Sequence, residues 1–179
     1  MSNLNFVPVF QGETRVSEDP NDVLSTILGS CVAACIWDPI AKVGGMNHFL
    51  LPGEIGTQST SMRYGVNAME LLVNGLLKHG GDRTRFKVKL YGGAKMFEGR
   101  ASIGEKNIQF ARWYVQSEGF SLAEEDLGGD RGRKIRFWPT TGRVQHSLMS
   151  DAPPDEKEIV AKPRKPAAPE KPIGDIELF

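Results

Sequence analysis

The sequence has no strong charge of one sign, no long apolar run and few cysteines. Its 22 Lys and Arg residues balance its 22 Asp and Glu residues, so charge does not suggest nucleic acid or a membrane surface as a partner. No apolar run approaches the ~18 residues that span a bilayer, and the N-terminus MSNLNFVPVF lacks the pattern of a secretory signal. We therefore expect a cytoplasmic protein without direct membrane insertion, acting on a protein or a small molecule.

The two cysteines, Cys31 and Cys35, are too close together to stabilise a fold by closing a long loop. A reducing compartment would keep both as thiols. A metal site formed by these cysteines and His48 has little support, because a fourth ligand at suitable spacing is missing. The sequence gives no reason to expect a metal or an organic cofactor.

The composition divides the chain near residue 150. Residues 1–150 are long enough for one folded domain with a sizeable core. Residues 151–179 hold six of the eleven prolines and mixed charges, which is typical of a disordered tail. The final IGDIELF is either a frayed end or a docking motif anchored by Ile176, Leu178 and Phe179.

Apolar patterning within residues 1–150 predicts more strands than helices. We expect helices at 62–79, capped by Thr60 or Ser61 and ended by Gly80-Gly81, and at 105–118. Strands are expected at 6–10, 14–16, 30–37, 45–51, 86–94, 120–129 and 133–144. This order favours an α/β (α+β-like) fold, a layered α/β sandwich with mixed or antiparallel sheets and two main helices.

Cys31 and His48 lie on two apolar segments joined by the polar bend DPIA. If Asp38 to Ala41 form a type I turn, residues paired across the hairpin sum to 79, which places Cys31 directly opposite His48. Their Cβ atoms would then be ~4.5–5.5 Å apart. We expect symmetric four- or six-residue loops to keep the same sum, whereas a bulge or an odd-length loop would break it.

Such a pair suits acyl transfer from an amide, because an adjacent imidazole increases the thiolate fraction of a cysteine and can protonate the leaving amine. Gly29 in LGSC permits a tight backbone, and amides near Cys31 could donate to an oxyanion. Candidates for a third residue that orients His48 are Ser25, Thr26, Ser30 and Asn47. The alternative is a buried core cysteine and a hydrogen-bonded structural histidine.

Two glycine clusters, YGGA at 91–94 and GGDRGRK at 128–134, are compatible with anion-binding loops but match neither the P-loop nor the dinucleotide pattern. Tight turns beside a cleft are the favoured interpretation.

Several motifs together resemble the CheD family of bacterial chemoreceptor glutamine deamidases. They occur in order between about residues 7 and 145: LGSC (28–31), DP (38–39), GGMNHFLLP (44–52), RYG (63–65), YGGAKMF (91–97), IGEKN (103–107) and EDLGGDRGRKI (125–135). Their number and order make the resemblance specific.

The resemblance implies a cysteine-dependent hydrolase of receptor glutamine side chains, with Cys31 as nucleophile and His48 as base. The family's threonine, six positions before the cysteine, falls on Ser25, and the neighbouring Thr26 is the other candidate. The implied fold is similar to the catalytic domain of cytotoxic necrotizing factor toxins. The implied partners are chemoreceptor cytoplasmic domains and, in some bacteria, the phosphatase CheC.

Two other functions fit the same residues. A different cysteine amidohydrolase, such as a protease or a transglutaminase, would use the same pair of side chains. A non-catalytic chemotaxis adaptor would bind receptors or a CheC-like phosphatase, with an incidental thiol.

Overall fold

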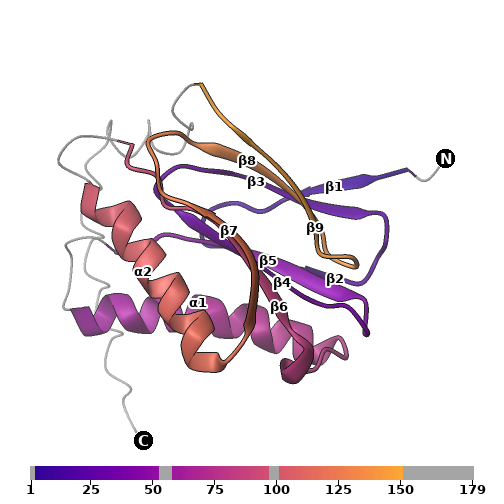
Figure 1. Cartoon of the computed structure of the whole chain (residues 1–179). Coiled ribbons are helices and arrows are strands. Elements are labelled where there is room, and N and C mark those ends of the chain that lie inside the picture. The colour runs from indigo at the N-terminus through magenta and orange to yellow at the C-terminus, as the bar shows by residue number, and fades with distance from the viewer. Residues whose placement is uncertain (1–2, 53–57, 97–100, 151–179) are drawn as a thin grey trace, which may run out of the picture.

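The computed structural model describes residues 3–52, 58–96 and 101–150, which form three layers (Figure 1). Sheet A consists, in spatial order, of β1 (Asn5–Pro8), β3 (Asp22–Leu28), β8 (Arg133–Trp138) and β9 (Arg143–Leu148). Sheet B consists of β2 (Thr14–Ser17), β5 (Val43–Phe49), β4 (Val32–Asp38), β6 (Lys87–Gly92) and β7 (Ser121–Leu127). The β1–β3 and β6–β7 pairs are parallel and the others are antiparallel, so the predicted layered sandwich with mixed sheets is confirmed.

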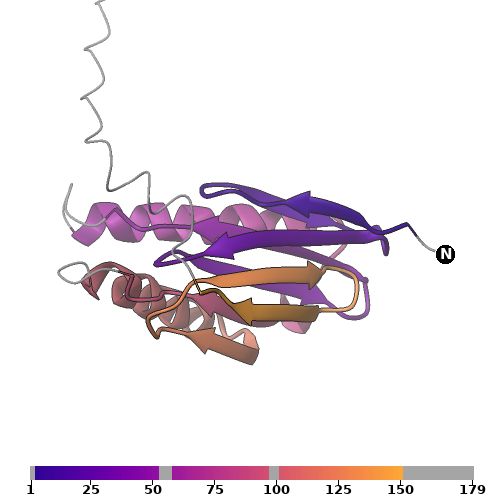
Figure 2. The same ribbon diagram turned by 90° about the horizontal axis from the view of Figure 1, so that it is seen from above.

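The third layer contains α1 (Gln58–Lys78) and α2 (Ala101–Glu118), which pack on sheet B. Seen from above in Figure 2, sheet A lies in front and the helices lie behind. The apolar face of α1 is fully buried through Met69, Leu72, Val73 and Leu76. After α1, the N–H of Gly81 donates to Leu76 and that of Gly80 to Leu77, with Gly80 at φ +88°, so the predicted glycine stop is a Schellman motif.

Strands β4 and β5 are buried on both faces because they lie in the middle layer. One face contacts the helices, and the other contacts sheet A across a second apolar cluster. This double burial explains why the two segments read as continuous apolar runs rather than as alternating strands. The second cluster contains both cysteines, so the candidate site lies in the layer between the sheets.

Several predicted boundaries were wrong. Strand β3 was missed, because Ser25 and Thr26 interrupt its apolar pattern. Both helices begin earlier than expected, so Thr60 and Ser61 lie inside the first turn of α1 rather than capping it. Residues 133–144 form β8 and the start of β9, joined by a short hairpin. The predicted tail at 151–179 lies outside the described residues.

The β4–β5 hairpin has a longer loop than predicted. The carboxylate of Asp38 accepts hydrogen bonds from the N–H groups of Ile40 (2.9 Å) and Ala41 (3.0 Å), and its carbonyl accepts one from Lys42 (2.9 Å). Lys42 adopts φ +54°, and Asp38 pairs with Val43. Paired residues therefore sum to 81 and not 79, so the predicted register was wrong.

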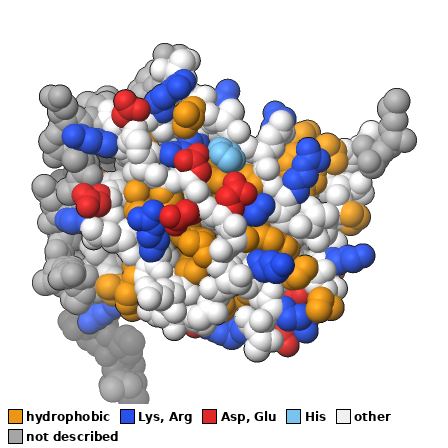
Figure 3. Space-filling model, viewed as in Figure 1, with side chains coloured by type: hydrophobic (Ala, Val, Ile, Leu, Met, Phe, Trp, Pro, Cys, Tyr) orange, Lys and Arg blue, Asp and Glu red, His pale blue; other side chains and the backbone are white. Residues whose placement is uncertain are grey.

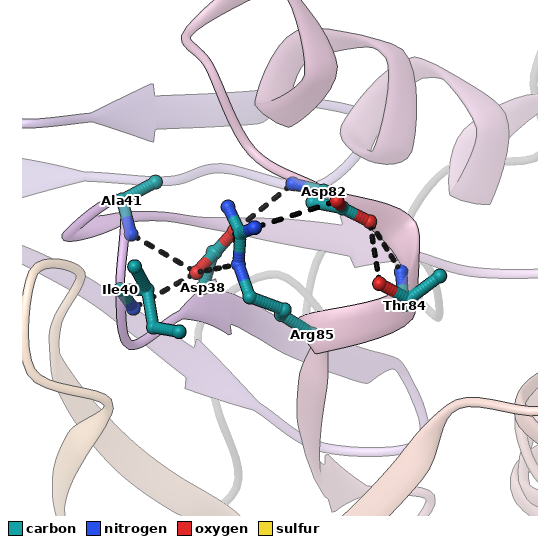
Figure 4. Close-up of polar contacts among 6 residues, drawn as sticks. All are labelled: Asp38, Ile40, Ala41, Asp82, Thr84 and Arg85. Carbon is teal, nitrogen blue, oxygen red and sulfur yellow. Dashed lines mark hydrogen bonds and ion pairs between the residues drawn. The ribbon is translucent and has the colours of Figure 1, made fainter.

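The side chain of Asp38 also fastens this turn to the short 3-10 helix η1 (Arg83–Arg85) (Figure 4). The N–H of Asp82 donates to the carboxylate at 2.9 Å, and Arg85 donates from Nε at 3.0 and 3.1 Å. Burial alone would raise the pKa of Asp38, but the hydrogen bonds from Arg85 and from the backbone outweigh it and hold the pKa well below its usual range. Asp38 is therefore a structural carboxylate that sets the hairpin loop.

Charges of both signs are interspersed on the face shown in Figure 3. Arg112 and Glu125 pair between α2 and β7, and Arg133 binds Asp126 through two hydrogen bonds of 3.0 Å. Positive and negative side chains are therefore paired with one another in α2, β7 and β8.

Candidate active site

His48 lies on β5 with its side chain in the layer between the sheets. Its Nδ1 is 2.9 Å from Thr26 Oγ1 and 3.2 Å from the carbonyl oxygen of Val9. Thr26 Oγ1 donates its proton to that same carbonyl at 2.6 Å. The hydroxyl must then accept from His48, which assigns the ring proton to Nδ1 and the basic lone pair to Nε2. An imidazole in this tautomer is oriented to act as a base through Nε2.

Cys31 lies one residue before β4 and is held through the backbone of the LGSC loop. Its carbonyl accepts from Gly93 N–H at 2.8 Å, and the carbonyl of Gly29 accepts from Ala94 N–H at 2.9 Å. Gly92 adopts φ +111°, and a Cβ there would come 2.1 Å from the carbonyl oxygen of Cys31. The glycines of YGGA therefore allow the end of β6 to pack directly against the backbone of the LGSC loop.

Asn107, a buried residue of α2, connects the segments that carry the two candidate residues. Its Nδ2 donates to the carbonyl of Ser30 at 2.8 Å, and its Oδ1 accepts from Leu51 N–H at 2.9 Å. One side chain thus ties the loop before Cys31 to the chain just after β5. Its spacing from Cys31 gave no signal in the sequence, and only the IGEKN motif drew attention to it.

The hairpin places Cys31 and His48 on one face but not directly opposite. His48 pairs with Ala33, two residues after Cys31. A shift of two residues preserves the face because side chains alternate with a period of two. Cys31 is therefore diagonal to His48, and diagonal neighbours in a regular ladder lie ~7–8 Å apart, within reach of an aromatic side chain.

The two thiols have different surroundings. Cys31 is 4% exposed, and its Sγ lies 3.6 Å from Oε1 of Gln11, whose side chain is exposed. Cys35 is completely buried, and burial raises the pKa of its thiol far above the usual value, against a smaller opposing effect of Lys89. Cys31 is thus the thiol at the margin of the inter-sheet layer, and Cys35 is an apolar core residue.

The candidates for a third residue are separated by strand alternation. Thr26 faces the inter-sheet layer and contacts His48, whereas Ser25 alternates to the opposite face of β3. Asn47 faces the helices, where its Nδ2 donates to the carbonyl of Ala68 at 3.3 Å. Ser30 contributes a carbonyl to Asn107, as described above. Thr26 has a hydrogen bond to His48 in the structure, which favours it as the residue that orients the ring.

A metal site formed by Cys31, Cys35 and His48 was also raised as an alternative by the sequence. In the part of the chain that the structure describes, no group of three or more His, Cys, Asp or Glu side chains is arranged to hold an ion. Likewise, none of the described helices is long and apolar enough to cross a membrane.

Comparison with known proteins identifies the family. The family model "CheD chemotactic sensory transduction" matches residues 50–147. The chain belongs to the CheD family. A protein of Rhizobium leguminosarum bv. trifolii named probable chemoreceptor glutamine deamidase CheD is 49% identical over 97% of this chain and 95% of its own length. Proteins of the same name from Acidiphilium cryptum and Caulobacter vibrioides are 49% and 45% identical over 97% of this chain, and 93% and 92% of their own lengths.

The CheD family assignment confirms the resemblance seen in the sequence, and it covers nearly the whole chain. The match includes the segment from Leu50 onward that carries Asn107 and YGGA. The CheD motifs LGSC, GGMNHFLLP, YGGAKMF and IGEKN meet in space around Cys31, through the contacts of Gly93, Ala94 and Asn107.

Proposed function

We propose that this CheD protein hydrolyses glutamine side chains of chemoreceptor cytoplasmic domains to glutamate, with Cys31 as the nucleophile. The observation that carries the proposal is the His48–Thr26 contact, which leaves Nε2 as the unprotonated ring nitrogen of a histidine on the same face of the hairpin as the Cys31 thiol. The family relationship supplies the substrate class, since the relatives are named chemoreceptor glutamine deamidases.

The reaction proceeds through a thioester. Nε2 of His48 takes the Sγ proton of Cys31, and the sulfur attacks the amide carbon of the substrate glutamine. The carbonyl electron pair moves to oxygen, where backbone N–H groups near Cys31 stabilise the charge. The imidazolium then protonates the leaving nitrogen, and ammonia departs.

Water completes the cycle. His48 removes a proton from a water molecule, the hydroxide attacks the thioester carbon, and the C–S bond breaks to give glutamate and the free thiol. Throughout, Thr26 holds the ring in the Nδ1–H form and stabilises the imidazolium, as the third member of a triad does.

The partners follow from the same assignment. We propose chemoreceptor cytoplasmic domains as the substrates, a CheC-like phosphatase as a further partner, and the cytoplasm as the compartment in which the protein acts. The C-terminal IGDIELF, predicted from the sequence as a frayed end or a docking motif, lies outside the described residues.

The test is incubation of the protein with a chemoreceptor cytoplasmic domain from the same bacterium, followed by mass spectrometry and an ammonia assay. We expect a gain of about one mass unit per modified glutamine, the amide-to-acid difference of the thioester route. Cys31→Ala should abolish the gain while receptor binding persists, and Cys35→Ala, the matched control, should retain activity.

Other outcomes point elsewhere. Receptor binding without any mass gain in the wild-type protein would indicate the adaptor function, and chain cleavage would indicate a protease. Unchanged receptor modification by Cys31→Ala would refute the proposed nucleophile.

A further inference from the structure

The carboxamide of Gln11 lies at the Cys31 thiol, with Oε1 3.6 Å from Sγ. Neither the pattern of the sequence nor the hairpin geometry drew attention to Gln11. It comes from the connection between β1 and β2, 20 residues away from Cys31 along the chain. A neutral side chain at this position brings both a hydrogen-bond acceptor and a donor group to the sulfur.

The backbone of Gln11 is fixed relative to His48. Phe10 to Glu13 form a tight turn in which Glu13 N–H donates to Phe10 at 2.9 Å, with Gly12 at φ +87°. Gly12 N–H donates to the carbonyl of His48 at 2.8 Å, and His48 N–H donates to the carbonyl of Glu13 at 3.1 Å. The turn is therefore paired directly with the strand that carries the proposed base.

The contacts that hold this turn do not use the side chain of Gln11. The carboxylate of Glu13 accepts from Phe10 N–H at 3.0 Å, and the remaining contacts are backbone hydrogen bonds. Gln11 is an exposed residue whose side chain contacts the Cys31 thiol. Its removal should therefore leave the fold intact, which makes a functional role separable from a structural one.

An oxyanion on a carbon attached to Cys31 would form next to the sulfur. A donor to that oxygen must lie ~2.7–3.1 Å from it. A carboxamide 3.6 Å from Sγ is at a suitable distance for this, and the terminal torsion of glutamine is soft enough for the amide to turn its nitrogen inward. In the structure the oxygen faces the Cys31 sulfur, and such a turn would bring the nitrogen to the oxyanion once the C–S bond has formed.

We propose that Gln11 is a catalytic residue of this CheD protein, which donates a hydrogen bond from Nε2 to the oxyanion of the tetrahedral intermediate beside Cys31. The inference rests on the proposed function. It adds a side-chain donor to the backbone donors near Cys31. No bond to Gln11 forms or breaks, since the sulfur supplies the new bond and the carbonyl electron pair moves to oxygen.

The experiment compares Gln11→Ala with Gln116→Ala, which removes an exposed glutamine of α2, in steady-state ammonia release from a chemoreceptor cytoplasmic domain. We expect Gln11→Ala to lower kcat by about 10- to 100-fold with KM changed less than about twofold, while the control retains wild-type rates. Removing a buried oxyanion donor lowers kcat by ~10²–10³-fold. We expect a loss no larger than this for Gln11, because water can partly replace a donor on an exposed side chain. Thermal unfolding should be the same for both variants.

Alkylation of Cys31 by iodoacetamide provides a second readout, since that displacement forms no oxyanion. Gln11→Ala should leave its rate within about twofold of wild type. A faster alkylation together with a raised kcat/KM would show that Gln11 merely covers the thiol, and unchanged kcat would equally overturn the inference. A mass gain at Gln11 that needs Cys31 would show that Gln11 is itself a substrate.

Failure of the proposed function has a different signature. If wild-type protein releases no ammonia and leaves the receptor mass unchanged, both proposals fall. If wild-type protein is active, Cys31→Ala is inactive and Gln11→Ala keeps its kcat, only the role of Gln11 falls.

Discussion

Replacing Thr26 by Val removes the hydroxyl that contacts His48 while keeping the shape of the side chain. The variant loses the hydrogen bond from Nδ1 to Oγ1, which measures 2.9 Å. During catalysis the ring is an imidazolium, and a hydrogen bond from a charged donor contributes ~1.5–3 kcal/mol. The Val9 carbonyl, 3.2 Å from Nδ1, can take over part of this role.

We therefore expect a net loss of ~1–2 kcal/mol of transition-state stabilisation. This corresponds to a fall in kcat of about 5- to 30-fold, since 1.36 kcal/mol is a factor of ten. Thr26→Ser keeps the hydroxyl and should recover most of the rate. Ser25→Ala is the matched control on the other face of β3 and should stay within about twofold of wild type.

The assay is steady-state ammonia release from a chemoreceptor cytoplasmic domain, with urea unfolding to confirm that each variant is folded. A loss of activity in Ser25→Ala with full activity in Thr26→Val would refute the reasoning. It would show that the position of the family's threonine, and not the contact in this structure, determines the third residue.

Three further predictions concern the thiols and the supports of the site. Iodoacetamide should modify Cys31 in the native protein and Cys35 only after unfolding, because burial raises the pKa of the Cys35 thiol and excludes the reagent; peptide mapping will show which is labelled. Asp38→Ala should lower the free energy of unfolding, measured in urea, by ~3 kcal/mol. This value is at the low end of the cost of breaking a buried ion pair, because the Arg85 side chain is one-third exposed. The low folded-state pKa of Asp38 means that its contribution is complete above about pH 4 and is lost as the pH falls toward that pKa, so the difference from Asp38→Ala should shrink in acid. Asn107→Ala should lower the free energy of unfolding by ~2–3 kcal/mol in the same assay, because it removes two buried hydrogen bonds. It should also lower the activity per folded molecule, because these bonds join the segments that carry Cys31 and His48. Equal activity per folded molecule would contradict this positioning role.

Local patterns were reliable where one residue type has one structural meaning. Gly80 predicted the end of α1, and the apolar spacing of its buried face predicted the helix itself. The hairpin between Cys31 and His48 was also predictable, since its flanking segments are short, apolar and joined by a polar bend. Its register was not, because Asp38 binds both the loop amides and Arg85, a residue 47 positions away.

The sequence by itself determined the pair, since the CheD motifs mark Cys31 and His48, and their odd spacing along the chain places them on one face of a hairpin closed by any even-length loop. Only the tertiary structure decided which residues surround that pair. Thr26 reaches His48 from sheet A, Gln11 reaches Cys31 from a turn paired with β5, and Asn107 reaches both segments from α2. The physical reason is that strand alternation and residue chemistry are local properties, whereas the stacking of two sheets and a helix layer brings together side chains whose separation along the chain carries no signal.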